Sequence, residues 1–244
     1  LSAAELAWLR EKERATEASR ESRGGRRLAS KGGAEPALLR LLLDARVLLM
    51  FSSLFFLATA YSGVFFFQPS ILSNGGRFSM SVSALLNRVP FMVATPLALL
   101  NASVADRSGR NLRHVVFGQA LAAAGMLATA IVLRGGAPAL PLELASLTLI
   151  EIGVECFYTP FVAFQGTMLS ESVAATGYAV INMGGATGFS VGPSIVGSLR
   201  RSTDSFSLSF LALGALAGVS LCMTLTLLAM ARRRTRVERA IEMT

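Results

Sequence analysis

Six long apolar runs dominate this sequence and limit its possible folds more than any other feature. They lie at residues 47–68, 84–105, 114–133, 142–164, 174–199 and 206–231. A helix needs about 20 residues to cross the hydrocarbon core of a bilayer, and every run reaches that length. Only helices and closed β-barrels satisfy their backbone in lipid, and no run alternates as a barrel strand does. The sequence therefore predicts an all-α integral membrane protein with six transmembrane helices.

The composition argues against a soluble domain. Hydrophobic residues make up 52% of the 244 residues and charged residues only 16%, whereas a soluble domain has about 25% charged residues. The net charge of +8 alone would fit a nucleic-acid-binding protein. The basic residues lie at the ends of the apolar runs, however, and form no platform with aromatic residues. We therefore expect a lipid bilayer around the chain and no nucleic acid as partner.

The remaining residues flank the six runs. Residues 1–45 hold a capping box at Ser2 and Glu5, which predicts a short charged helix, and a Gly-, Ser- and Arg-rich stretch at 21–33, which predicts a flexible linker. Residues 46–231 hold the predicted transmembrane domain, and residues 232–244 are a basic tail. Because the chain starts at Leu1 without a Met or a signal peptide, we expect an upstream segment to be missing.

The Lys and Arg residues predict the orientation in the membrane. With the amino end in the cytoplasm, 18 of them lie on the cytoplasmic side and 5 on the other. Cytoplasmic loops carry an excess of Lys and Arg, so we expect both termini in the cytoplasm. An even number of spans also puts both termini on one side. We expect a multi-pass protein of the plasma (inner) membrane.

The loop between the second and third runs carries the most specific motif. It reads ASVADRSGR at residues 102–110 and resembles the G-x-L-a-D-R-x-G-R loop of the major facilitator superfamily, with Ala102 in place of the first Gly. A Gly permits a tight turn, and an Asp can meet the positive end of a helix dipole. The resemblance implies a loop that holds one helix against another in the outward-open state, through Asp106, Arg107, Gly109 and Arg110. The alternative is a positively charged loop with one incidental Asp.

Further motifs resemble one branch of that superfamily. NMGGATGFSVGP at 182–193 is similar to the eleventh helix of anion:cation symporters, A-x-G-I-A-L-I-N-S-x-G-N-L-G-G-F-x-G-P. YTPF at 158–161 resembles the G-P-F-W turn of their tenth helix, and FFQP at 66–69 resembles the F-W-L-P of their seventh. The chain as a whole resembles the carboxyl-terminal half, helices seven to twelve. It departs from the pattern at Ala186, where the family has a second Asn, and at Phe189-Ser190, which replaces Gly-Phe.

The resemblance implies a fold and a function. The fold is one half of a major facilitator fold, built as two three-helix inverted repeats. The function is secondary active transport of small organic anions with protons or sodium by alternating access, together with a missing amino-terminal six-helix half. The alternatives are a membrane sensor or partner-binding protein that does not transport, and a standalone six-helix channel.

Two acidic residues, Glu151 and Glu155, lie four residues apart near the centre of the fourth run. A charge at the bilayer centre costs about 2.5 to 3.5 kcal/mol, so such residues usually face a cavity and serve ion movement. We hypothesise that one or both bind the coupling proton, the alternative being an ion pair with an Arg. The resemblance adds further substrate-pathway residues, namely Tyr61, Phe67, Tyr158, Asn182 and Thr187. The aromatic ones can equally be packing or lipid contacts.

Small residues mark helix contacts. Gly184, Gly188 and Gly192 recur every four residues, which predicts a flat helix face that allows close backbone approach. Pro160 and Pro193 are expected to kink or end their helices.

The sequence shows no catalytic pattern. It has no H-E-x-x-H, C-x-x-C or P-loop motif, and Cys156 and Cys222 lie inside apolar runs. Its only histidine, His114, lies at the cytoplasmic edge of a run. We therefore expect no enzymatic activity, no catalytic residue, no cofactor and no metal site.

Overall fold

The computed structural model describes residues 41–73, 78–135, 140–169 and 173–242, with side chains up to Arg232. The chain divides into two units, Leu1–Leu43 and Asp44–Thr244. In the first unit, only residues 41–43 are described, and they are helical. The charged helix and the linker predicted within residues 1–33 lie outside the described residues.

The described part of the second unit consists of helices joined by short turns, without strands. Its helices are α3 (Ala45–Leu72), α4 (Met80–Leu86), α5 (Arg88–Ser108), α6 (Asn111–Arg134), α7 (Leu140–Met168), α8 (Ala174–Thr203) and α9 (Phe206–Glu242).

Five of these segments are long and apolar enough to cross a membrane. They are α3, α4 joined with α5, α6, α7, and α9 as far as Arg232. The prediction of a helical, multi-pass membrane protein is thereby confirmed for the described residues. Helix α8 is 30 residues long, but its many Gly, Ser and Thr residues make it less apolar, and it is not among the five. The count of six transmembrane helices stays a prediction.

Side chains cap the amino ends of two of the described helices. The Asp44 carboxylate caps α3 by accepting a hydrogen bond from the Arg46 N–H at 2.8 Å, and Ser79 caps α4 through the Val82 N–H at 3.3 Å. Pro160 and Pro193 lie inside α7 and α8 and end neither helix. Helix α9 continues to Glu242, so the predicted basic tail at 232–244 is helical over most of its length.

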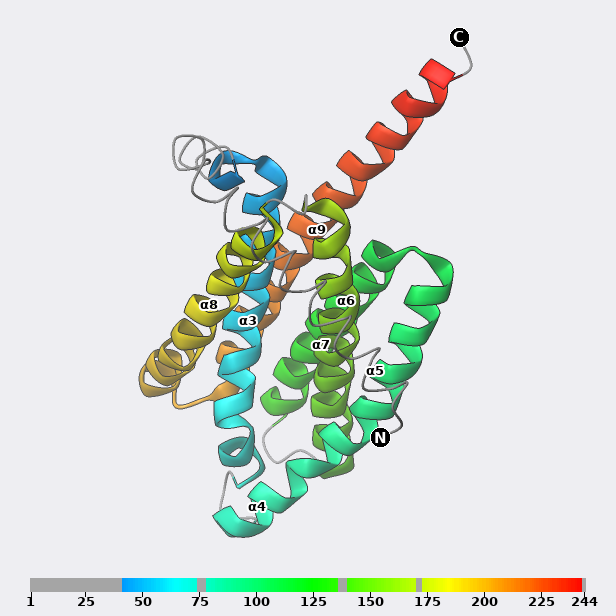
Figure 1. Cartoon of the computed structure of the whole chain (residues 1–244). Helices are drawn as coiled ribbons and strands as arrows, with labels where there is room; N and C mark the ends of the chain where they lie inside the picture. Colours follow the sequence, from blue (N-terminus) through cyan, green and yellow to red (C-terminus); the bar gives the residue numbers. More distant parts are fainter. Residues whose placement is uncertain (1–40, 74–77, 136–139, 170–172, 243–244) are drawn as a thin grey trace, which may run out of the picture. The chain divides into compact units, whose positions relative to one another are not determined.

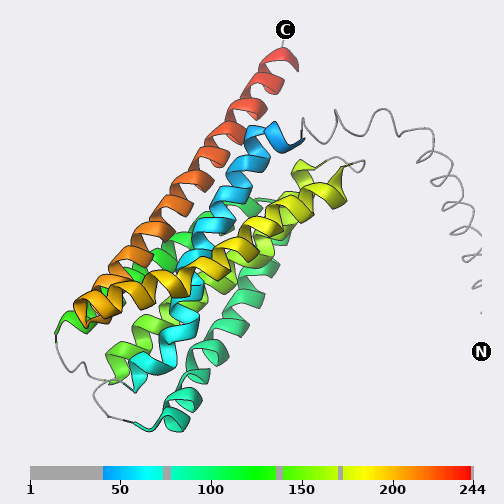
Figure 2. The same ribbon diagram turned by 90° about the vertical axis from the view of Figure 1, so that its left-hand side faces the viewer.

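The helices pack in a pattern that is symmetric between the first and second halves of the bundle. The main pairs are α3 with α8 and α9, α6 with α7 and α9, and α5 with α7. Figures 1 and 2 show α3 running beside α8 and α9 in both views. Exchanging α3 with α7, α5 with α8 and α6 with α9 reproduces the same set of pairs.

Helix α8 approaches α3 closely because glycines face it. A Cβ atom built on Gly184 would lie 2.7 Å from the Phe51 carbonyl oxygen, and one on Gly188 would meet the Phe55 carbonyl oxygen. A Cβ on Gly192 would overlap the Thr59 carbonyl oxygen. The structure therefore places this four-residue stripe directly against the α3 backbone. Only glycine leaves room for such an approach.

Glycines also join α6 to α7, a contact that was not predicted from the sequence. A Cβ on Gly118 would lie 2.6 Å from the Phe157 backbone nitrogen, and one on Gly125 would lie 2.7 Å from that of Ile150. A Cβ on Gly153 of α7 would meet the Ala122 backbone nitrogen in return. The seven-residue spacing of Gly118 and Gly125 puts both on one helix face, and this spacing was the available signal.

A buried polar cluster ties α3, α6 and α9 together. The Gln119 amide donates to the Ser53 hydroxyl at 2.9 Å and to the Ser220 hydroxyl at 2.7 Å. Ser220 donates to the Ser53 carbonyl at 2.6 Å, and the Thr224 hydroxyl lies 2.9 Å from that of Ser53. All four side chains are fully buried. Such hydrogen bonds between helices stabilise membrane proteins by roughly 0.6 to 2 kcal/mol each.

The glycine stripe gives a first test. We expect Gly192→Val to lower the melting temperature in detergent, because the added side chain collides with α3 and overpacking costs about 1–3 kcal/mol. Gly218→Val on α9 is the matched control, since nothing lies within 4 Å of a Cβ there. The measurement is helical circular dichroism during heating. Equal melting temperatures for the two variants would contradict the observed α3–α8 packing.

Candidate functional site

A pocket of about 480 Å³ lies among α3, α7 and α8. Its walls come from helices that belong to both halves of the bundle. The residues that line it are Leu54, Leu57, Ala58, Tyr61, Val154, Glu155, Phe157, Tyr158, Asn182, Gly185, Ala186 and Phe189. Four of the predicted pathway residues are among them: Tyr61, Glu155, Tyr158 and Asn182.

A hydrogen bond joins the wall of this pocket to a buried carboxyl group. The Tyr61 hydroxyl on α3 donates to Glu151 Oε2 on α7 at 3.1 Å. The Glu151 side chain is fully buried, and its Oε1 has no hydrogen-bond partner among the described residues. Glu155, one helical turn further on, is partly exposed and lines the pocket. The two carboxyl groups therefore share one face of α7, Glu151 inside the protein and Glu155 at its pocket surface.

Two predicted pathway residues lie elsewhere. The Phe67 ring packs against Phe206 of α9, with 6.1 Å between the ring centres, and Phe67 does not line the pocket. The Thr187 hydroxyl donates to the Met183 carbonyl of its own helix at 2.8 Å, on an exposed face of α8. Both residues were predicted from the family resemblance alone. The resemblance does not determine where a side chain points, because this depends on which neighbouring helix it faces.

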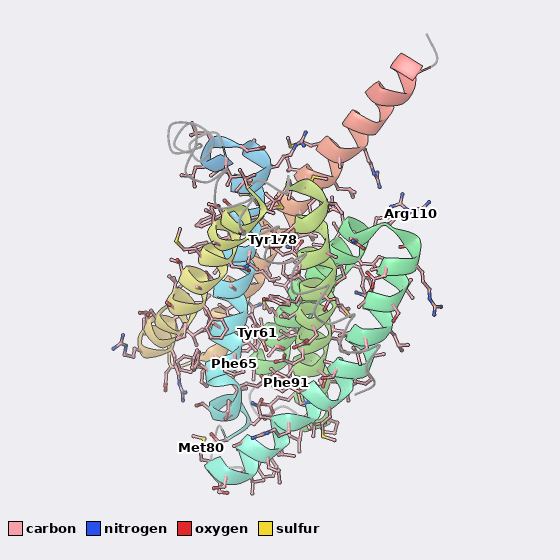
Figure 3. The ribbon with its side chains drawn as sticks, viewed as in Figure 1. Tyr61, Phe65, Met80, Phe91, Arg110 and Tyr178 are labelled. Atoms are coloured by element: carbon pink, nitrogen blue, oxygen red, sulfur yellow. The ribbon has the colours of Figure 1, made fainter. Side chains whose placement is uncertain are left out.

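A cluster of aromatic rings adjoins the pocket through Tyr61 and Phe189, and Phe189 is central in this cluster. Its ring centre lies 6.4 Å from Tyr61, 6.0 Å from Phe65 and 5.7 Å from Phe66. Phe65 in turn contacts Phe91 of α5 at 6.4 Å. Figure 3 labels Tyr61, Phe65 and Phe91, which lie close together between α3 and α5. Phe189 was missed as a site residue, although it follows Asn182 by seven residues and so shares its helix face.

The pocket wall has an acidic side chain and no basic one. Glu155 supplies a carboxyl group, and no Lys or Arg occurs among the described residues that line it. The remaining polar groups are the two tyrosine hydroxyls and the Asn182 amide. This wall can accept or donate hydrogen bonds, hold a proton on a carboxyl group and stack against a flat ring. It offers no positive charge to an anion.

The predicted conformational loop is the turn between α5 and α6. Gly109 has φ 62° and ends α5 in the left-handed conformation, donating its N–H to the Ala105 carbonyl at 3.0 Å. The side chains of Asp106, Arg107 and Arg110 are exposed. The structure thus shows a tight turn that presents three charged groups to the outside.

Asn101 fixes this turn to α7. Its amide donates to the Cys156 carbonyl at 2.9 Å, and its Oδ1 lies 2.8 Å from His114 Nδ1 at the start of α6. Three helices therefore meet at one side chain. Asn101 was not predicted as a site residue, although a lone Asn inside an apolar run was the available signal.

The turn gives a second test. Gly109→Val should destabilise the protein by about 1–2 kcal/mol, because a left-handed backbone strains L-residues and β-branched ones most. Gly109→Asn should lose much less stability, because Asn tolerates that conformation. A Cβ at this position meets nothing within 4 Å, so crowding cannot explain a difference. Melting curves of both variants in detergent measure it, and identical curves would refute the backbone argument.

Comparison with known proteins points to transport. No protein-family model matches the chain. Two proteins of Agrobacterium vitis that are named as tartrate transporters are 32% and 31% identical to it over 199 residues, which is 82% of this chain and 45% and 43% of theirs. A protein of Acinetobacter baumannii named as a quinolone resistance transporter is 29% identical over 187 residues, 75% of this chain and 42% of its own. The chain thus spans less than half the length of these relatives, and it is similar to membrane transporters.

Proposed function

We propose that this chain forms one half of a secondary active transporter, which moves a small organic anion together with protons or sodium by alternating access. The names of the similar proteins support transport, and the tartrate transporters support a small organic acid as substrate. Because the chain matches less than half of each relative, the second half of the substrate cavity would come from another six-helix domain. The working protein is then a full-length transporter of the plasma membrane.

The helix pairing supports an internal repeat. The first set of helices is α3, α4 with α5, and α6, and the second set is α7, α8 and α9. The contacts between helices follow the same pattern when each helix of one set is replaced by its counterpart in the other. If α8 also spans the membrane, each set crosses it three times, so the two sets run in opposite directions. Inverted repeats of this kind place the substrate site at the membrane midplane between them. The pocket among α3, α7 and α8 lies between the two sets in the same way.

One observation carries the proposal: the Tyr61 hydroxyl donates a hydrogen bond to the fully buried carboxyl group of Glu151 beside the pocket. An ionisable group inside a membrane protein is expensive and usually serves ion or proton movement. Glu151 has one oxygen that is held by Tyr61 and one that has no partner among the described residues. A proton on that second oxygen would make the group neutral, and Glu155 at the pocket surface would pass the proton on. We therefore assign the coupling proton to this pair.

The turn at Gly109 is the proposed conformational element. Its exposed Asp106, Arg107 and Arg110 would contact the opposing half of the transporter in one state and separate in the other. The Asn101 hydrogen bonds would transmit this change to α7, which carries both glutamates.

The pocket wall also favours a second candidate substrate. Glu155 and the ring faces of Tyr61, Tyr158 and Phe189 attract a positive charge on an aromatic molecule, through ion pairing and cation–π contact. An organic anion, by contrast, would need its positive partner from the other half. The relative named as a quinolone resistance transporter is consistent with an aromatic substrate.

The proton assignment predicts a change in pH dependence. In cells that express the complete gene, uptake should rise as the external pH falls, because a protonated carrier is needed for inward movement. Glu151→Gln should reduce uptake about tenfold or more and remove this pH response, since Gln cannot exchange a proton. Asp204→Asn is the control, because this exposed residue lies at the end of α8, outside the pocket.

Glu155→Gln is the second arm of the experiment. Loss of the pH response in Glu155→Gln alone would move the proton site to Glu155. An unchanged pH response in both variants would contradict proton coupling through this pair. Sodium dependence of the remaining uptake then tests the other coupling ion.

The two candidate substrate classes predict opposite results when an organic anion and an aromatic amine compete for uptake. With an anionic substrate, labelled tartrate enters the cells and a protonated aromatic amine such as phenethylamine does not compete. With a cationic substrate, the amine enters, tartrate does not compete, and Glu155→Gln weakens amine uptake about tenfold because it removes the ion pair. Uptake of neither compound class above that of empty cells would favour the sensor interpretation.

A further inference from the structure

A second cavity lies where α5 turns into α6, beside the last turn of α7 and the stretch of α9 from Leu228 to Arg232. Its volume is about 410 Å³. The residues that line it are Gly109, Arg110, Asn111, Leu112, Arg113, Phe164, Thr167, Met168, Leu228, Ala231 and Arg232. None of them lines the pocket that contains Glu155. Figure 3 labels Arg110 at this turn, at the opposite end of the α4–α5 segment from Met80.

The rim of this cavity is strongly basic. Arg110, Arg113 and Arg232 come from the turn, from the first turn of α6 and from α9, and all three side chains are exposed. No Asp or Glu occurs among the described residues that line the cavity. Arg110 occupies the cap position of α6 without a side-chain cap hydrogen bond, so the positive end of that helix adds to the same field. Three guanidinium groups at one rim attract a phosphate group strongly.

The floor of the cavity is apolar. Leu112 and Phe164 are buried, and Met168 and Leu228 are half-buried beside them. A free phosphate ion would use the rim and leave this floor in contact with water. A molecule that carries a phosphate on a hydrocarbon tail would cover both. The combination of basic rim and apolar floor therefore selects an amphipathic anion.

We propose that this cavity binds an anionic phospholipid, with its phosphate group against Arg110, Arg113 and Arg232 and the start of an acyl chain along Leu112, Phe164 and Leu228. Basic pockets between transmembrane helices at the cytoplasmic face are known sites for acidic lipid headgroups. The Lys and Arg distribution assigns this end of the bundle to the cytoplasmic side, where acidic lipids face the protein. The site does not depend on whether the chain transports a substrate.

Lipid binding by the purified protein in mild detergent tests the proposal. Native mass spectrometry compares retention of phosphatidylglycerol with that of phosphatidylcholine, which has no net charge. We expect wild-type protein to retain phosphatidylglycerol preferentially. The variant Arg110→Gln/Arg113→Gln/Arg232→Gln should bind it about a hundredfold more weakly, at roughly fivefold for each arginine lost.

A matched variant separates a site from general charge attraction. Arg88→Gln/Arg134→Gln/Arg201→Gln removes the same charge from exposed residues that do not line the cavity, and it should bind phosphatidylglycerol like wild type. Equal weakening in the two triple variants, or equal retention of both lipids by wild type, would overturn the proposal. Should the first triple variant fail to fold by circular dichroism, Arg113→Gln alone is compared with Arg113→Lys, which keeps the charge and should bind more tightly.

Two further measurements distinguish the lipid from a free phosphate ion. Leu228→Ser should weaken phosphatidylglycerol binding, because it disrupts the apolar floor and leaves the arginines in place. Inorganic phosphate at millimolar concentration should displace little of the lipid. Complete displacement by inorganic phosphate, with no effect of Leu228→Ser, would identify the site as a phosphate site and refute the lipid proposal.

Discussion

The close approach of α8 to α3 is the contact on which the candidate site depends. Glycines at 184, 188 and 192 let the two backbones touch, and this brings Asn182 and Phe189 of α8 next to Tyr61 of α3. In lipid the hydrophobic effect does not drive helices together, so association relies on van der Waals contact and hydrogen bonds between helices. The same solution joins α6 to α7 through Gly118 and Gly153. The glycine positions therefore determine where the pocket lies, because they determine which helices approach one another closely.

Two groups of buried polar residues in the bundle differ in how they are hydrogen-bonded. Ser53, Gln119, Ser220 and Thr224 bond mainly to one another across three helices, and they form a fixed, buried connection. Glu151 differs because it has one partner, Tyr61, and one free oxygen among the described residues, and because its neighbour Glu155 opens onto the pocket. Hydrogen bonds that link three helices stiffen a core, whereas a carboxyl group with an unbonded oxygen beside a cavity is able to change its protonation and its partners. This contrast is the physical reason for proposing the proton site at Glu151 and Glu155.

The two cavities also have opposite electrostatic character. The pocket among α3, α7 and α8 has a carboxylate and aromatic rings and no described basic residue, whereas the cavity at the α5–α6 turn has three arginines and no described acidic residue. A proton and a resident acidic lipid would therefore be kept apart by charge as well as by distance along the helices. Asn101 connects the two regions, since it bonds to the α6 start at the turn and to the α7 backbone next to Glu155.

The sequence by itself determined the membrane class, the approximate extent of the helices and the glycine stripe of α8, because apolar length and residue spacing are properties of a single segment. It also identified Tyr61, Glu155, Tyr158 and Asn182, which do line the pocket, and Phe67 and Thr187, which do not. Only the tertiary structure decided which faces meet. The Tyr61–Glu151 hydrogen bond joins residues 90 positions apart, and the basic cavity combines a turn with segments of two distant helices. Spacing fixes a side chain relative to its own helix, whereas its partner depends on how that helix is rotated against its neighbours, which is set by packing between helices.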